Sequence, residues 1–120
     1  MKTIKSKLEG ILLLKYPTVF KDHRGTYVET YNRKLFTEAT RLEMNFVQDD
    51  YSRSKKGVLR GIHGDDRTWK LVSCLYGTIF LVVVNCDEFS RQFHQWDSFV
   101  ISDESGLSVL IPPFFGNGHL

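Results

Sequence analysis

The sequence contains few of the features that define secreted, membrane or nucleic-acid-binding proteins. Only 2 of its 120 residues are cysteine, which is too few for a disulfide framework. The 16 lysines and arginines nearly balance 14 acidic residues, and a net charge of +2 gives no case for binding nucleic acid or an anionic membrane. The longest apolar run, residues 79–84, is far shorter than the roughly 18 residues that a membrane-spanning helix needs. With no signal peptide, a cytoplasmic protein is expected.

Length and composition predict one globular domain over residues 1–120. The apolar fraction of 42% and the charged fraction of 25% are those of an average folded protein, and the length is sufficient for one core. Aromatic residues make up 13% of the chain, which favours strands and ring-stacking pockets. Cys74 and Cys86 both fall in expected strands, so they are predicted to be buried free thiols.

Short strand signals separated by turn residues dominate the chain. β-branched and aromatic residues cluster in these segments, and glycine, proline or charged residues separate them. Residues 44–52 are expected to be extended, without a clear apolar face. The predicted strands are residues 11–14, 18–20, 26–31, 58–63, 69–75, 78–86, 96–101 and 107–111.

One helix is expected, over residues 32–42. Asn32 is a suitable N-cap, and apolar residues recur after it at three- and four-residue spacing. Residues 69–75 and 78–86 are predicted to form a hairpin around a Tyr-Gly turn. The second arm is almost continuously apolar, which predicts burial of both its faces. Many short strands with one brief helix are typical of an antiparallel sandwich or barrel.

The most informative polar residues lie around one strand, residues 58–63. His63 ends that strand, Arg60 precedes it by three positions, and Lys70 opens the next strand. Strict alternation places Arg60 and His63 on opposite faces, but a bulge at Gly61 can turn both to one side. A base, an ammonium group and a guanidinium group at the same opening of a β-barrel suit an anionic ligand. The structural alternative is a half-buried strand histidine.

Metal binding is a weaker interpretation, and no metal site is predicted. A metal site in a β-barrel usually needs two histidines one residue apart on one strand, but position 65, two after His63, is aspartate. The P-loop, the dinucleotide fingerprint and paired-cysteine motifs are also missing from the sequence. The four histidines are His23, His63, His94 and His119.

Five blocks occur in a fixed order along the chain: F-x-D-x-R-G-x-Y-x-E at residues 20–29, Gln48, G-V-L-R-G-I-H at residues 57–63, K-L-V at residues 70–72 with Gly77, and I-P-P-x-x-G-N-G-H at residues 111–119. Together these blocks resemble the dTDP-4-dehydrorhamnose 3,5-epimerase family. The resemblance runs from about residue 11 to the end, and it implies an all-β cupin jelly roll. The short connection between His63 and Lys70 is more similar to the family's 4-keto-heptose branch.

The resemblance implies a cofactor-independent isomerase that epimerises carbon 3, carbon 5 or both in a nucleotide-diphosphate 4-keto sugar, in bacterial polysaccharide sugar biosynthesis. A base removes the proton beside the ketone, and a cation stabilises the resulting enolate. His63 matches the family's base, and Lys70 matches the residue that stabilises the enolate. The substrate-binding matches are Arg24, Glu29, Gln48, Arg60, Asn117 and His119.

The family's general acid, a tyrosine after the second cupin motif, has no match up to Leu120. The same holds for the carboxylate that orients the catalytic histidine. We therefore expect a cupin domain that is incomplete at its C-terminus, with weak or no net epimerisation. The resemblance also implies a homodimer whose N-terminal strands, around residues 24–29, reach the neighbour's pocket. A non-catalytic nucleotide-sugar-binding homologue and a metal-dependent cupin enzyme remain the alternatives, and the nucleotide and the sugar stay open.

Overall fold

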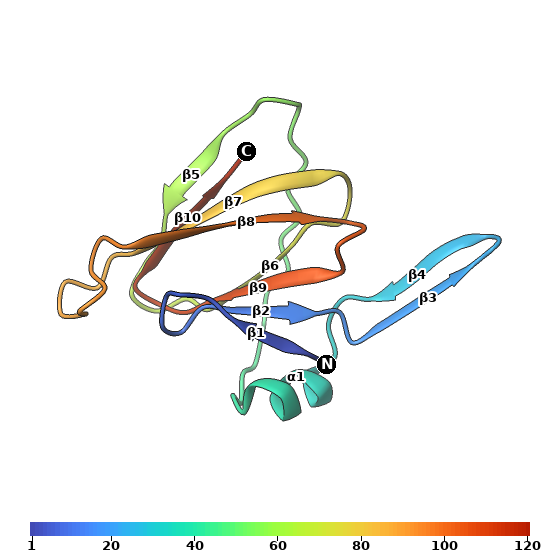
Figure 1. Ribbon diagram of the computed structural model, residues 1–120, viewed down its shortest axis with the longest axis horizontal. Helices are drawn as coiled ribbons and strands as arrows, with labels where there is room; N and C mark the ends of the chain where they lie inside the picture. The colour runs from blue at the N-terminus through green and yellow to red at the C-terminus, as the bar shows by residue number, and fades with distance from the viewer.

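Two four-stranded antiparallel sheets form the body of the protein, whose computed structural model describes residues 1–120 (Figure 1). The first sheet has the strand order β1-β2-β9-β6, and the second has the order β5-β10-β7-β8. Two further strands, β3 and β4, pair only with each other. The elements are β1 (Thr3–Lys5), β2 (Leu12–Lys15), β3 (Thr18–Asp22), β4 (Gly25–Glu29), α1 (Arg33–Thr40), β5 (Arg60–His63), β6 (Lys70–Ser73), β7 (Thr78–Asn85), β8 (Trp96–Ser102), β9 (Leu107–Ile111) and β10 (Phe115–His119).

The core lies between the two sheets, as the expected all-β sandwich requires. Alternate residues of β7 and β9, among them Leu81, Val83, Val109 and Ile111, are fully buried in one apolar cluster. The other face of β9 presents Leu110 to a second cluster beneath α1. β9 is therefore apolar on both faces because the second sheet covers one of them and the helix covers the other.

The predicted helix is confirmed as α1, although it is shorter than residues 32–42. Asn32 is its N-cap, and the Asn32 Oδ1 accepts a hydrogen bond of 3.1 Å from the Leu35 N–H. Phe36 is completely buried, and its ring packs against Tyr31 and Phe46. The helix ends where Arg41 adopts a left-handed conformation with φ of 61°. This aromatic cluster fixes α1 on the first sheet.

The predicted hairpin of residues 69–75 and 78–86 is wrong. β6 pairs with β9 in the first sheet, whereas β7 pairs with β8 and β10 in the second. The Tyr-Gly turn does reverse the chain, but it carries the chain from one sheet to the other. Only the inner face of β7 is buried, because Phe80 on the outer face is 45% exposed. Cys86 is likewise exposed rather than buried, whereas Cys74 is buried as predicted, and both thiols are free.

Strand β10 was not predicted, because its sequence F-G-N-G-H contains two glycines, which are uncommon in strands. It nevertheless lies between β5 and β7 in the second sheet. A Cβ atom on Gly118 would stand only 2.8 Å from the carbonyl oxygen of Arg60. The glycines therefore allow β5 to approach β10 closely. β1 is a further strand that the sequence pattern did not indicate.

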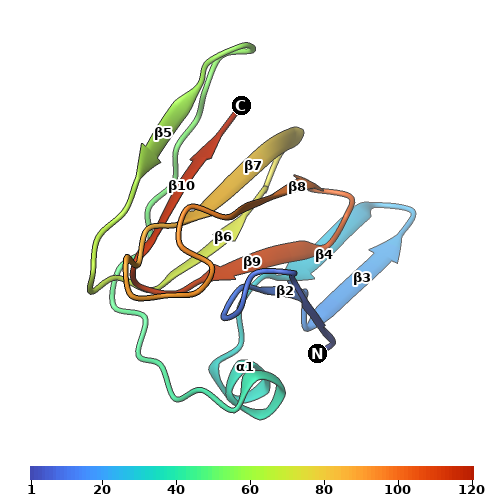
Figure 2. The ribbon, with the colours of Figure 1, turned by 60° about the vertical axis from the view of Figure 1, so that its left-hand side comes forward.

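Between α1 and β5, residues 41–59 form no strand, and residues 44–52, which were expected to be extended, join neither sheet. Figure 2 shows this segment passing from α1 to β5 outside the two sheets. The hairpin of β3 and β4 also stands away from the sheets (Figures 1 and 2). The helix α1 is too short and too polar to cross a membrane.

Candidate active site

A groove of about 1890 Å³ opens along β6, at the edge of the first sheet. The extended segment 42–58 lines its opposite side, and residues of β5 and β10 complete it. This space exceeds the roughly 300–1,000 Å³ of ordinary small-molecule pockets. The groove therefore has room for a ligand with several parts.

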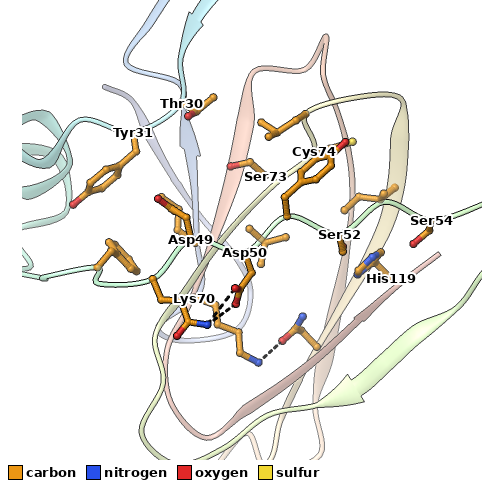
Figure 3. Close-up of a pocket in the computed structure, with 18 of the residues that line it drawn as sticks. Thr30, Tyr31, Asp49, Asp50, Ser52, Ser54, Lys70, Ser73, Cys74 and His119 are labelled. Atoms are coloured by element: carbon orange, nitrogen blue, oxygen red, sulfur yellow. Dashed lines mark hydrogen bonds between the residues drawn. The ribbon is translucent and has the colours of Figure 1, made fainter.

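Lys70 brings a positive charge into the groove. It is the first residue of β6, it is half-buried, and the Lys70 Nζ donates a hydrogen bond of 2.9 Å to the Asn117 Oδ1 (Figure 3). Asn117 lies on β10, directly opposite His63 on β5 in the strand register. Residues from both sheets thus place a lysine, an amide and an imidazole on the same groove.

The end of β5 carries the predicted bulge. Asn117 pairs with His63 and His119 pairs with Arg60, so the register shifts by one residue between the two pairs. The bulge is therefore confirmed, but its consequence differs for the two side chains. His63 lines the groove, whereas Arg60 is exposed outside it, where its Nε donates a hydrogen bond of 2.8 Å to the Ser54 Oγ.

Two more predicted residues reach the same groove. Gln48 lies on the extended segment, and its Nε2 donates hydrogen bonds of 2.9 and 3.2 Å to the carboxylate oxygens of Asp50. His119, the last residue of β10, lines the groove two positions after Asn117 (Figure 3). Asp50 is a lining residue that the sequence analysis did not select, and its alternation with Gln48 was the available signal.

The family profile for dTDP-4-dehydrorhamnose 3,5-epimerase matches residues 5–120. This chain belongs to that family. It is 40% identical to the dTDP-4-dehydrorhamnose 3,5-epimerase of Salmonella typhimurium over 123 residues, which cover 100% of this chain and 67% of the relative. The enzyme of Methanothermobacter thermautotrophicus is 39% identical, over 98% of this chain and 63% of the relative.

Solved structures of the epimerase family share the fold. The structure of dTDP-6-deoxy-D-glucose-3,5-epimerase from Legionella pneumophila, in complex with dTDP-4-keto-L-rhamnose, superposes with a TM-score of 0.90 at 34% identity. The superposed region covers 98% of this chain and 63% of the Legionella pneumophila chain. The Elizabethkingia anophelis enzyme gives a TM-score of 0.85 at 39% identity, and the match covers 100% of this chain and 67% of that one. The predicted family and cupin-type fold are confirmed, and the chain spans about two thirds of the length of these relatives.

Besides Arg60, two more residues that match the epimerase motifs lie away from the groove. Arg24 is exposed at the tip of the β3–β4 hairpin, where its guanidinium group lies 2.7 Å from the Asp22 carboxylate and lowers the pKa of Asp22. Glu29 ends β4, and its Oε1 accepts a hydrogen bond of 3.5 Å from the Thr18 Oγ1. Within one chain, the structure therefore does not bring Arg24 or Glu29 to His63.

Asp65 fixes the short connection between the two family residues His63 and Lys70. Its carboxylate accepts hydrogen bonds from the hydroxyl group of Thr68 at 2.7 Å and from the N–H groups of Arg67 and Thr68 at 2.9 and 2.6 Å. These bonds lower the pKa of Asp65 from 3.8 to about 2. Sequence analysis missed this role, although aspartate is a turn signal because its side chain can bond to the backbone two residues on, as it does here with the Arg67 N–H.

We expect the contribution of Asp65 to stability to disappear in acid. Its pKa is lower in the folded chain than in the unfolded chain, so its stabilising effect is complete above about pH 4 and is lost as the pH falls towards about 2. Urea unfolding of the wild type and of Asp65→Ala should therefore show a difference that shrinks between pH 4 and pH 2. Asp66→Ala is the matched control, since the neighbouring Asp66 forms an ion pair with Arg67 at 3.8 Å in place of the three hydrogen bonds of Asp65. A constant difference across this range would contradict the prediction.

The histidine, cysteine, aspartate and glutamate side chains do not gather in any group of three or more that could hold a metal ion. The family residues that do meet in the groove, His63, Lys70, Gln48, Asn117 and His119, are proton-transfer, cationic and hydrogen-bonding groups.

Proposed function

We propose that the protein abstracts the proton beside the ketone of a nucleotide-diphosphate 4-keto sugar, as a cofactor-independent epimerase. The observation that supports the proposal best is the convergence of His63 and Lys70 on one groove from two different sheets. Family membership supports the same reaction, since the relatives carry the name of this epimerase. Both cysteines are free thiols, which agrees with our proposal that the reaction takes place in the cytoplasm.

The proposed chemistry divides between the two side chains. Histidine exchanges protons readily near neutral pH, so the imidazole of His63 serves as the base. As the proton leaves, negative charge develops on the ketone oxygen. The Lys70 ammonium stabilises that charge, which is absent from the bound substrate and so lowers the barrier selectively. The substrate's own ketone acidifies the proton, so the step needs no cofactor.

A thymidine-linked 4-keto sugar is the first substrate to test. The Legionella pneumophila relative was solved with dTDP-4-keto-L-rhamnose. The size of the groove suits a nucleotide, a diphosphate and a sugar together. We propose that Gln48 and His119 contact this ligand from opposite sides, since they lie on the extended segment and on β10.

Exchange of solvent hydrogen tests the proposed function. The chain is incubated in heavy water with a dTDP-linked 4-keto-6-deoxy sugar, and NMR follows the signals of carbons 3 and 5. We expect deuterium to enter at one or both positions, because exchange needs only the base and the enolate-stabilising cation. Binding of the nucleotide sugar without any exchange would overturn the proposal in favour of the non-catalytic binding homologue.

We also propose a homodimer in which the β3–β4 hairpin of each copy reaches the groove of the other. In the hairpin, the side chains of Val19, Phe20 and Tyr27 are 51%, 63% and 72% exposed. An isolated two-stranded hairpin is only marginally stable, and β3 and β4 pair only with each other. β6 has a free edge beside the groove, and free edges favour pairing with another strand. Docking there brings Arg24 and Glu29 to the neighbour's groove, where the guanidinium group suits a diphosphate.

A charge on the hairpin should separate the proposed dimer. We expect Tyr27→Asp to raise the dissociation constant of the dimer by at least about 30-fold, as the loss of an aromatic hot spot worth about 2 kcal/mol does. Sedimentation equilibrium measures it. Phe89→Asp is the control, since Phe89 is also exposed but lies in the loop between β7 and β8. A monomeric wild type, or equal effects of the two substitutions, would argue against this dimer.

A further inference from the structure

We propose that Asn117 is a positioning residue for the epimerisation: its amide oxygen holds the Lys70 ammonium beside His63 without neutralising its charge. The inference rests on the proposed function of the groove. It assigns Asn117 a role that differs from the substrate contact implied by its sequence motif. Three observations carry it, namely the rigidity of the strand, the burial of the amide and the absence of a carboxylate within 4.0 Å of the Lys70 Nζ.

Asn117 stands on the most constrained strand of the groove. β10 is bonded on both sides, so Asn117 pairs with His63 of β5 and with Val83 of β7. Lys70, by contrast, lies on an edge strand of the other sheet and has a long, flexible side chain. A hydrogen bond of 2.9 Å from the rigid strand therefore limits the positions that the ammonium group can take.

The surroundings of Asn117 give its amide no structural purpose apart from this bond. It is 8% exposed, and the inward-facing residues of neighbouring strands, such as Val83 and Leu81, are fully buried and apolar. A buried amide costs free energy unless it is hydrogen-bonded. The side chain of Lys70 supplies the one partner that the Asn117 side chain has within the chain.

The neutral amide leaves the lysine chemically competent. The four ion pairs of the chain involve Lys7, Arg24, Arg67 and Arg91, so no carboxylate lies within 4.0 Å of the Lys70 Nζ. An ammonium group has three donors, and the bond to Asn117 uses one of them. Two donors and the full positive charge thus remain for the enolate oxygen. An aspartate at position 117 would have the same shape but would neutralise that charge.

Two substitutions test the role in the full 120-residue chain. With saturating dTDP-linked 4-keto-6-deoxy sugar in heavy water, we expect Asn117→Leu to lower the exchange rate at carbons 3 and 5 about tenfold, with a change in KM below about threefold. Asn117→Asp keeps the hydrogen-bond acceptor and the shape, yet it should also slow exchange by at least about tenfold, because it neutralises Lys70. An unchanged rate in either variant overturns the inference, even if the other variant does not fold.

Asn85→Leu is the matched control. Asn85 is also a buried asparagine of the second sheet, but its Nδ2 donates to the Ser90 Oγ in a loop, outside the groove. Both leucine variants should lower the melting temperature, because each removes a buried hydrogen bond. Only the variant at position 117 should slow exchange at constant KM. Equal slowing by both variants would assign Asn117 a merely structural role and overturn the inference.

A second measurement separates this inference from the proposed function. The rate at which an amine-reactive acylating agent modifies Lys70, measured by mass spectrometry, reports how firmly the lysine side chain is held. This rate can be measured whether or not the chain turns over substrate. We expect acylation to be several-fold faster in Asn117→Leu than in Asn85→Leu. If the wild type exchanges no deuterium, the proposed function fails while this comparison still decides the positioning of Lys70. If exchange occurs and neither readout responds to Asn117, the function stands and the positioning role is wrong.

Discussion

His63→Ala is expected to lower the rate of proton exchange at carbons 3 and 5 by about 10²–10⁴-fold, the range typical of a general base. His63 ends β5 and faces the groove, and the bulge in that strand sets its register opposite Asn117. Removing the imidazole leaves the ketone and the Lys70 ammonium in place but takes away the acceptor for the proton. NMR of the sugar in heavy water measures the loss.

The structure provides a control histidine for this experiment. His94 stacks on Phe93 in the loop before β8 and lies outside the groove. His94→Ala should therefore exchange at the wild-type rate. Added imidazole should restore part of the activity of His63→Ala, because a small base can occupy the space left in the groove. Undiminished exchange in His63→Ala would remove His63 from the reaction and would overturn the proposed function.

Lys70→Met is expected to lower exchange by about 10²–10³-fold, similar to the loss of one donor to a developing oxyanion. Methionine preserves much of the apolar stem, so the packing of β6 changes little. The substitution removes the charge and also leaves the Asn117 oxygen without its donor. The decisive measurement is a comparison of exchange with calorimetric binding of dTDP. Exchange should fall far more than binding, since the charge acts on the enolate.

Lys15→Met serves as the matched control, because Lys15 is exposed on β2, away from the groove. It should leave both exchange and dTDP binding unchanged. The opposite pattern for Lys70→Met, weaker dTDP binding with normal exchange, would assign Lys70 to the diphosphate instead. That outcome would contradict its proposed role at the enolate and would also weaken the positioning role of Asn117.

Local features of the site were predictable from the sequence because they depend on near neighbours. The bulge beside Gly61 followed from the three-residue spacing of Arg60 and His63, and the register confirms it. The cap at Asn32 followed from the apolar repeat after it, and the side chain makes the expected bond. The ordered motif blocks also indicated the family, which the comparisons confirm.

Strand partners were beyond prediction from local patterns. The chain reversal after β6 was correct, but the predicted hairpin was wrong, because β6 takes β9 as its partner and β7 takes β10. Alternation of apolar residues shows which face of a strand is buried, and it carries no information on which distant strand lies beside it. Strand β10 was missed because its glycines are uncommon in strands. They are needed for the close approach of β5, which is a contact with a distant strand that the local pattern does not show.

The sequence by itself determined that this is an antiparallel β protein of the epimerase family, with His63 and Lys70 as its reactive candidates. These conclusions depend on residue types and on short spacings along the chain, which are the same in the unfolded and the folded protein. Only the tertiary structure decided that Lys70 meets Asn117 across the two sheets, and that Arg24 and Glu29 lie outside the groove of their own chain. Such contacts join residues far apart in sequence, and the packing of the sheets alone sets the distance between them.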